Sequence, residues 1–181
     1  SDQYGRLPPT IVSRCQRVVA PRPTVEAARA WLGEHGVRDV NAALAQSANA
    51  PLRARELADP DYQAERRAWL SALAAPRELA VTALAARIEA VPREARKERL
   101  GAVIDWLAGW CADLARVRSG GQPVANGDFE AALRSLARSV ATLPLFRYHR
   151  SLLSQRALVS HPLQPRLVAE ALLIDYRALF G

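Results

Sequence analysis

From residue 61 onwards, apolar residues recur every three or four positions, which is the spacing of one face of an α-helix. This pattern predicts six helices, over residues 61–75, 77–91, 95–118, 128–141, 144–159 and 165–180. Residues that interrupt helices separate them, namely Pro76, Pro92, Gly120-Gly121-Gln122-Pro123, Pro144 and His161-Pro162. We therefore expect residues 59–181 to form an all-α domain around one shared core.

Three shorter helical periods precede this part, within residues 20–58. The first follows Thr24, a residue type that caps helix N-termini, and Gly33 and Gly36 are expected to end it. The second is centred on the apolar residues Val40, Ala43 and Leu44, and the third covers 52–57. Three short helices in so few residues predict a small separate bundle.

The N-terminal stretch LPPTIVSRCQRVV has a different pattern. Thr10-Ile11-Val12 and Arg17-Val18-Val19 are clusters of the β-branched residues that favour short strands. Arg14 lies between the two clusters, so we expect it at a strand end or in the adjacent turn, with its side chain directed outward. An ordinary surface salt bridge is the alternative interpretation of such an arginine.

Charge adds a second question, because the 181 residues carry a formal net charge of +7 and the pI is near 10.4. Such a balance raises the question of a surface that binds nucleic acids or membranes. The 25 basic residues include one lysine, Lys97, and they are spread along the helices with no run longer than Arg66-Arg67 or Arg96-Lys97. A solvated basic surface and a phosphate-binding patch both remain possible on this pattern.

No apolar run approaches the roughly 18 residues that span a bilayer, and the start of the chain does not resemble a signal peptide. We therefore expect a cytoplasmic protein. Cys15 and Cys111 lie far apart and lack the spacing of zinc or redox motifs, so we predict that both are small buried hydrophobic residues.

Motifs for independent catalysis are missing from the sequence. A P-loop needs glycines before a lysine that reaches the phosphates, and Lys97 follows Arg96 with no such glycines nearby. Asp59 and Asp61 flank a proline, where N-capping explains them better than acid–base chemistry. The histidines are dispersed and are expected at the surface or at helix caps, and the tryptophans fall in apolar stripes typical of a core: His35, His149 and His161; Trp31, Trp69, Trp106 and Trp110.

The segment LPPTIVSRCQRV resembles the region around the Ser-Arg-Cys motif of bacterial clamp-loader proteins of the AAA+ family. The whole chain is similar to the C-terminal part of their delta-prime subunits, which belong to DNA polymerase III. Weaker similarities follow in the expected order, in AARAWL, APLRA, DWLAGWCADL and AEALLIDY. The resemblance implies that residues 1–19 end the AAA+ module, 20–58 form a three-helix lid and 59–181 form the helical collar. The rest of the AAA+ module, with its P-loop region and zinc-binding cysteines, is not in the sequence, which is therefore expected to be a fragment.

The resemblance also implies roles for individual residues. Arg14 would be an arginine finger, offered in trans to ATP bound on a neighbouring subunit, and Ser13 and Cys15 would shape its support. The fragment would bind no cofactor itself and would hydrolyse nothing. Arg53 lies near the start of the last lid helix, where active AAA+ proteins carry a sensor arginine, but a delta-prime-like subunit resembles an inactive ATPase and we favour no such role.

The implied function is that of a non-hydrolysing clamp-loader subunit in DNA replication. Its partners would be the delta and gamma or tau subunits of a hetero-pentamer, and through the assembled complex the sliding clamp and primer-template DNA. Two alternatives remain. One is a free-standing basic helical module that binds nucleic acids, and the other is a fragment of a catalytic clamp-loader ATPase.

Overall fold

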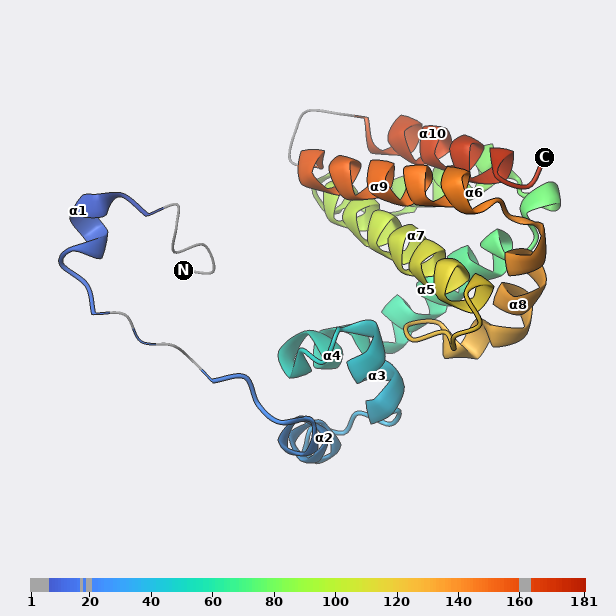
Figure 1. Ribbon diagram of the computed structural model, residues 1–181. Helices are drawn as coiled ribbons and strands as arrows, with labels where there is room; N and C mark the ends of the chain where they lie inside the picture. The colour runs from blue at the N-terminus through green and yellow to red at the C-terminus, as the bar shows by residue number, and fades with distance from the viewer. Residues whose placement is uncertain (1–6, 17, 19–20, 160–163) are drawn as a thin grey trace.

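A computed structural model describes residues 7–16, 18, 21–159 and 164–181 (Figure 1). Over these residues the chain forms ten α-helices joined by turns and short 3-10 segments, and it contains no strand. The prediction of an all-α protein is therefore confirmed. None of the helices in the described ranges is long and apolar enough to cross a membrane.

The first hydrophobic cluster belongs to three short helices, α2 (Val25–Glu34), α3 (Val40–Gln46) and α4 (Pro51–Leu57). Thr24 caps α2 as predicted, because its side chain accepts a hydrogen bond from the backbone N–H of Ala27. Gly33 lies inside α2, and Gly36 makes the turn after the helix with a φ of +76°. The buried residues of this cluster are Ala28, Leu32, Ala43, Leu44 and Ala54.

The second and larger cluster shares no residue with the first. Its helices are α5 (Pro60–Leu73), α6 (Val81–Ala86), α7 (Arg96–Arg118), α8 (Glu130–Ser139), α9 (Thr142–Leu158) and α10 (Pro165–Ala178). The long α7 is central, since α5, α8, α9 and α10 all contact it (Figure 1). Short 3-10 segments lie at Pro76–Glu78 (η2), Arg87–Ala90 (η3), Arg93–Ala95 (η4) and Gly127–Phe129 (η5).

Three of the four tryptophans, Trp69, Trp106 and Trp110, are buried in this core, as the sequence predicted. Trp110 donates a hydrogen bond from Nε1 to the Tyr176 hydroxyl at 2.8 Å, and that hydroxyl donates to the Leu73 carbonyl at 2.8 Å. These contacts join α7 and α10 to the end of α5. Trp31 is partly buried against the small cluster and stacks on His35.

The loop between α7 and α8 is attached to a buried carboxylate on α7. Asp113 accepts hydrogen bonds from the backbone N–H groups of Val124, Ala125 and Asn126, at 2.8 to 3.0 Å. Arg66 of α5 is also buried, and its guanidinium donates to Asn126 and Asp128 in the same loop. The loop is therefore held between two helices by charged side chains that have little contact with solvent.

Several helix boundaries differ from the predicted ones. The segment 77–91 is divided into η2, α6 and η3, because Leu79 adopts an extended conformation and is buried in the core. The segment 128–141 starts with the 3-10 turn η5, and α8 covers Glu130–Ser139. Helix α9 begins at Thr142, two residues before Pro144. Pro144 was expected to interrupt the helix, but in the first turn a backbone N–H has no intrahelical acceptor, so proline is tolerated there.

Candidate functional site

The Ser13-Arg14-Cys15 turn follows a short helix, α1 (Pro9–Val12), where the sequence predicted a strand at Thr10-Ile11-Val12. That prediction is wrong. Pro9 has the fixed φ that suits the first helical position, and the N–H groups of Ile11 and Val12 bond to the Pro8 carbonyl instead of a neighbouring strand. The second predicted strand includes Arg17 and Val19, which lie outside the described residues.

Arg14 is exposed, and its side chain forms a hydrogen bond with the short helix that precedes it. Its Nη1 donates to the Thr10 carbonyl at 2.9 Å, and the Ser13 hydroxyl donates to the same carbonyl at 3.3 Å. Arg14 forms no ion pair with any residue in the described ranges. Within those ranges, the surface salt bridge considered from sequence is not formed, and Arg14 keeps guanidinium N–H groups that face solvent.

The two cysteines have opposite environments. Cys15 is exposed, so the prediction that it is buried is wrong, whereas Cys111 is buried as expected. Cys15 belongs to a turn that contributes no residue to either hydrophobic cluster of the described residues, and its side chain lies at the surface. Burial in the centre of α7 raises the pKa of the Cys111 thiol well above its ordinary range, because the apolar surroundings disfavour the thiolate.

We expect a thiol reagent such as 5,5′-dithiobis(2-nitrobenzoate) to modify one thiol per native chain, and both thiols after unfolding in guanidinium chloride. The reagent must reach the sulfur atom, and Cys15 lies at the surface, whereas Cys111 is buried in a core that disfavours its thiolate. Absorbance of the released thiolate measures the count. Cys15→Ser should remove the fast reaction, and a native Cys15→Ser chain that still reacts quickly would contradict the burial of Cys111.

A network of charged side chains connects the two helical clusters. Arg53 of α4 lies 3.3 Å from a carboxylate oxygen of Asp105 on α7, and Arg156 of α9 donates to the other oxygen at 2.8 Å. Arg53, the residue considered for a sensor role, thus contacts Asp105 in this structure. Sequence spacing gave no sign of this contact, because the two residues come from helices far apart in the chain.

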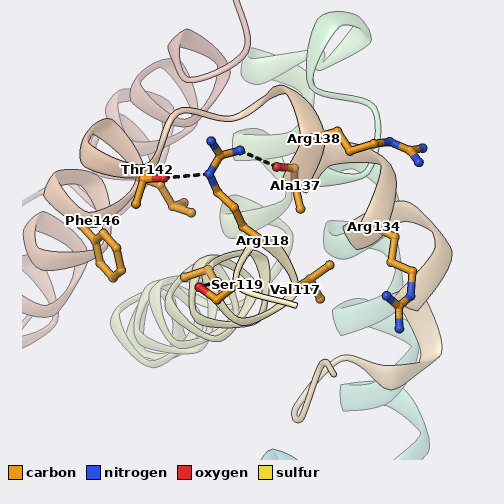
Figure 2. A pocket seen from close by; sticks show the side chains of 10 residues that line it. Val117, Arg118, Ser119, Arg134, Ala137, Arg138, Thr142 and Phe146 are labelled. Atoms are coloured by element: carbon orange, nitrogen blue, oxygen red, sulfur yellow. Dashed lines mark hydrogen bonds between the residues drawn. The ribbon is translucent and has the colours of Figure 1, made fainter. Parts of the chain in front are cut away.

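A basic pocket of about 580 Å³ lies where the end of α7 meets α8 and the start of α9 (Figure 2). Arg118 extends between the other two helices, where Nε donates to the Thr142 hydroxyl at 2.7 Å and Nη1 to the Ala137 carbonyl at 2.8 Å. Figure 2 shows Phe146 on the α9 side of the pocket and Arg134 and Arg138 on the α8 side. The pocket could not be predicted from the sequence, because its residues become neighbours only when three helices meet.

Other polar residues have mainly local roles. Asp59 caps α5 by accepting a hydrogen bond from the Tyr62 N–H, as predicted. His35 is exposed at the C-terminus of α2, as predicted, and contacts the Trp31 carbonyl at 2.7 Å. His149 is half-buried on α9, and His161 lies outside the described residues. The described ranges contain no cluster of three His, Cys, Asp or Glu side chains that could hold a metal ion.

The exposed Arg14 turn and the basic pocket are two candidate sites, because both present guanidinium groups at the surface. They lie at opposite ends of the sequence, one before α2 and one formed by α7, α8 and α9. Comparisons of the chain with models of protein families and with characterised proteins give no match.

Proposed function

We propose that the protein is a non-hydrolysing clamp-loader subunit of the delta-prime type, in which Arg14 acts on ATP bound by a neighbouring subunit. The observation that carries the proposal is the exposed Arg14, held by the Thr10 carbonyl and without an ion-pair partner among the described residues. It lies in the Ser-Arg-Cys sequence that resembles the arginine-finger motif of this family.

The chemistry of the side chain suits this role. A guanidinium is permanently charged and planar, so it can form two parallel hydrogen bonds with phosphate oxygens and stabilise charge that develops on the γ-phosphoryl group. The bond from Arg14 Nη1 to the Thr10 carbonyl restricts the side chain, and the remaining N–H groups are available to a ligand. Ser13 bonds the same carbonyl and supports the turn, and Cys15 flanks Arg14 at the surface.

The separation of the two hydrophobic clusters supports the proposed lid and collar. The cluster of α2, α3 and α4 corresponds to the lid over residues 20–58, and the cluster of α5 to α10 corresponds to the collar over 59–181. Obligate interfaces are apolar and depleted of charge at their centres. On α10, Leu167 and Ile174 are each at least half exposed, and Arg166 is paired with Glu170 and Glu89. This face is our candidate for contacts within the pentamer.

In this function the chain needs no cofactor of its own, since the ATP belongs to the neighbouring ATPase subunit. Its direct partners are the delta and gamma or tau subunits. The assembled complex would use ATP to open the sliding clamp and load it on primer-template DNA.

The test is Arg14→Ala in the full-length subunit, reconstituted with the ATPase subunits, clamp and primed DNA. We expect DNA-stimulated ATP hydrolysis to fall at least about tenfold, because stabilising charge is lost at the site that this arginine completes. Arg14→Lys should recover only part of the rate, since an ammonium group cannot form the planar double contact.

Arg22→Ala is the matched control, because Arg22 is also exposed and precedes the same three-helix bundle. Pentamer assembly, measured by size-exclusion chromatography with light scattering, should be the same for all variants. Wild-type rates of hydrolysis and clamp loading in Arg14→Ala pentamers would refute the proposal.

A further inference from the structure

Helix α9 has an apolar stripe on the side opposite the core. Leu145, Tyr148 and Leu152 are buried, whereas Leu143, Phe146 and Leu153 are each more than half exposed. Positions 143, 146, 150, 153 and 157 are spaced three or four residues apart, so they share one outward face. Exposed apolar residues in such a row are typical of a surface that binds another chain.

The same face is strongly basic. The sequence of α9, TLPLFRYHRSLLSQRAL, contains three arginines and no Asp or Glu. Arg150 lies within the apolar stripe and Arg147 beside it, and neither forms an ion pair with a residue that the structure describes. On the neighbouring α8, Arg138 is likewise exposed without such a partner. The surface therefore combines helical apolar spacing with uncompensated positive charge.

The basic pocket adjoins the N-terminal end of this stripe. Phe146 belongs to both (Figure 2). Val117 and Leu145 add apolar lining to the pocket. Thr142 accepts a hydrogen bond from Arg118, so its own hydroxyl hydrogen is free to bond elsewhere. A side chain of a bound segment could enter the pocket against Phe146 while neighbouring acidic groups reach Arg138.

We propose that the α9 face and the basic pocket bind an acidic amphipathic helix of another protein. Its apolar side chains would pack along Leu143, Phe146 and Leu153, and its carboxylates would pair with Arg138, Arg147 and Arg150. Helix recognition of this kind uses apolar anchors three or four residues apart. Complementary charge sets the partner and its orientation.

The distribution of charge favours this occupant over two others. A second copy of this chain would bring another +7 charge and a second basic α9 to the interface. The phosphates of single-stranded nucleic acid could pair with the arginines. Such a strand binds through base stacking on aromatic side chains and through its charged backbone, so aliphatic residues at helical spacing would not contribute to its binding. Leu143 and Leu153 are such aliphatic residues, and they are exposed on the same face as Arg150. The proposal does not depend on Arg14 or on the proposed function.

The experiment uses the whole 181-residue chain and fluorescent peptides of about 16 residues with capped ends. The probe peptide carries Leu or Phe at helical a and d positions and Glu at the flanking positions. A permuted peptide has the same composition without the stripe, and a single-stranded oligonucleotide matches the probe in charge. Binding is measured by fluorescence anisotropy at about 50 mM and about 300 mM NaCl.

We expect the wild-type chain to bind the probe at least about tenfold more tightly than either the permuted peptide or the oligonucleotide. Arg150→Glu and Phe146→Ala should each weaken binding about tenfold or more, and the higher salt should weaken it further. A probe with Lys in place of Glu should bind Arg150→Glu better than it binds the wild type.

Leu52→Ala and Arg55→Glu on α4 are the matched controls, because they change exposed residues of the same kinds on another helix. They should leave binding within about twofold of wild type. Circular dichroism should show the same helix content in every variant, since all four positions are at the surface. Equal binding of the permuted peptide, tighter binding of the oligonucleotide, or no binding of the probe would overturn the proposal.

Discussion

Asp113→Ala is expected to lower the free energy of unfolding by about 4 kcal/mol, because it removes the acceptor of a buried hydrogen-bond network. Asp113 is fully buried on α7 and accepts from three consecutive backbone N–H groups, from Asn126 Nδ2 and from Arg116. An alanine would leave those donors without an acceptor in a region that excludes water. Each buried unsatisfied polar group costs about 1 to 3 kcal/mol.

The damage should extend beyond α7, since the loop attached to Asp113 also supplies partners for Arg66. Arg66 is 2% exposed and donates to Asn126 Oδ1 at 2.7 Å and to Asp128 Oδ2 at 2.7 Å. When the loop is no longer attached to α7, the buried Arg66 guanidinium loses its hydrogen bonds to the loop. Those bonds compensate for the removal of its charge from water. The hydrogen bonds of Asp113 and those of Arg66 are therefore expected to be lost together. Arg66→Ala should lower the free energy of unfolding less in the Asp113→Ala variant than in the wild type.

Thermal unfolding followed by circular dichroism measures the effect, and Tm should fall by about 10 °C for a chain of this size. Asp113→Asn should lie between wild type and alanine, because the amide keeps one oxygen acceptor but loses the charge that strengthens the bonds. Asp105→Ala is the matched control on the same helix. Asp105 is partly exposed and pairs with exposed arginines, so its loss should cost less than about 1 kcal/mol. Equal stability of Asp113→Ala and Asp105→Ala would contradict this account.

Periodicity predicted the helices well where a long apolar stripe faces one core. Helices α5, α7 and α10 begin and end within about two residues of their predicted bounds, since proline, glycine and capping residues mark their ends. The segment over 77–91 was less predictable, because Leu79 leaves helical geometry to bury its side chain. Tertiary packing overrides local propensity at such a position.

The errors near Arg14 have a common physical cause. Thr10-Ile11-Val12 has strand propensity, but a strand needs a partner, and in the described part of the chain the backbone satisfies its bonds within a single helical turn. Without a partner surface, Cys15 is also exposed. The motif that suggested a role for Arg14 consists of neighbouring residues, so it could be recognised in the sequence. The basic pocket and the Arg53–Asp105 contact depend on how the helices pack, so the sequence pattern could not predict them.

Trp110→Ala is expected to lower the free energy of unfolding by about 4 kcal/mol, the second large effect. Trp110 is completely buried in α7, packs edge-on against Phe129 at 5.7 Å between ring centroids, and donates to Tyr176. Alanine would create a cavity among α7, η5 and α10 and would remove the donor to the Tyr176 hydroxyl. Burial raises the pKa of the Tyr176 phenol, so that group stays protonated and keeps its bond to the Leu73 carbonyl over the usual pH range.

A series at this position separates packing from hydrogen bonding. Trp110→Phe retains an aromatic ring but has no N–H, so it should cost about 2 kcal/mol, roughly half the cost of alanine. Trp31→Ala is the control, because Trp31 is only partly buried against the small cluster and should cost less than about 1.5 kcal/mol. Urea unfolding gives the three values, and the midpoint should fall in the order Trp31→Ala, Trp110→Phe, Trp110→Ala. If Trp110→Phe were as destabilised as Trp110→Ala, the hydrogen bond to Tyr176 would account for the whole effect and the packing of the ring for none of it.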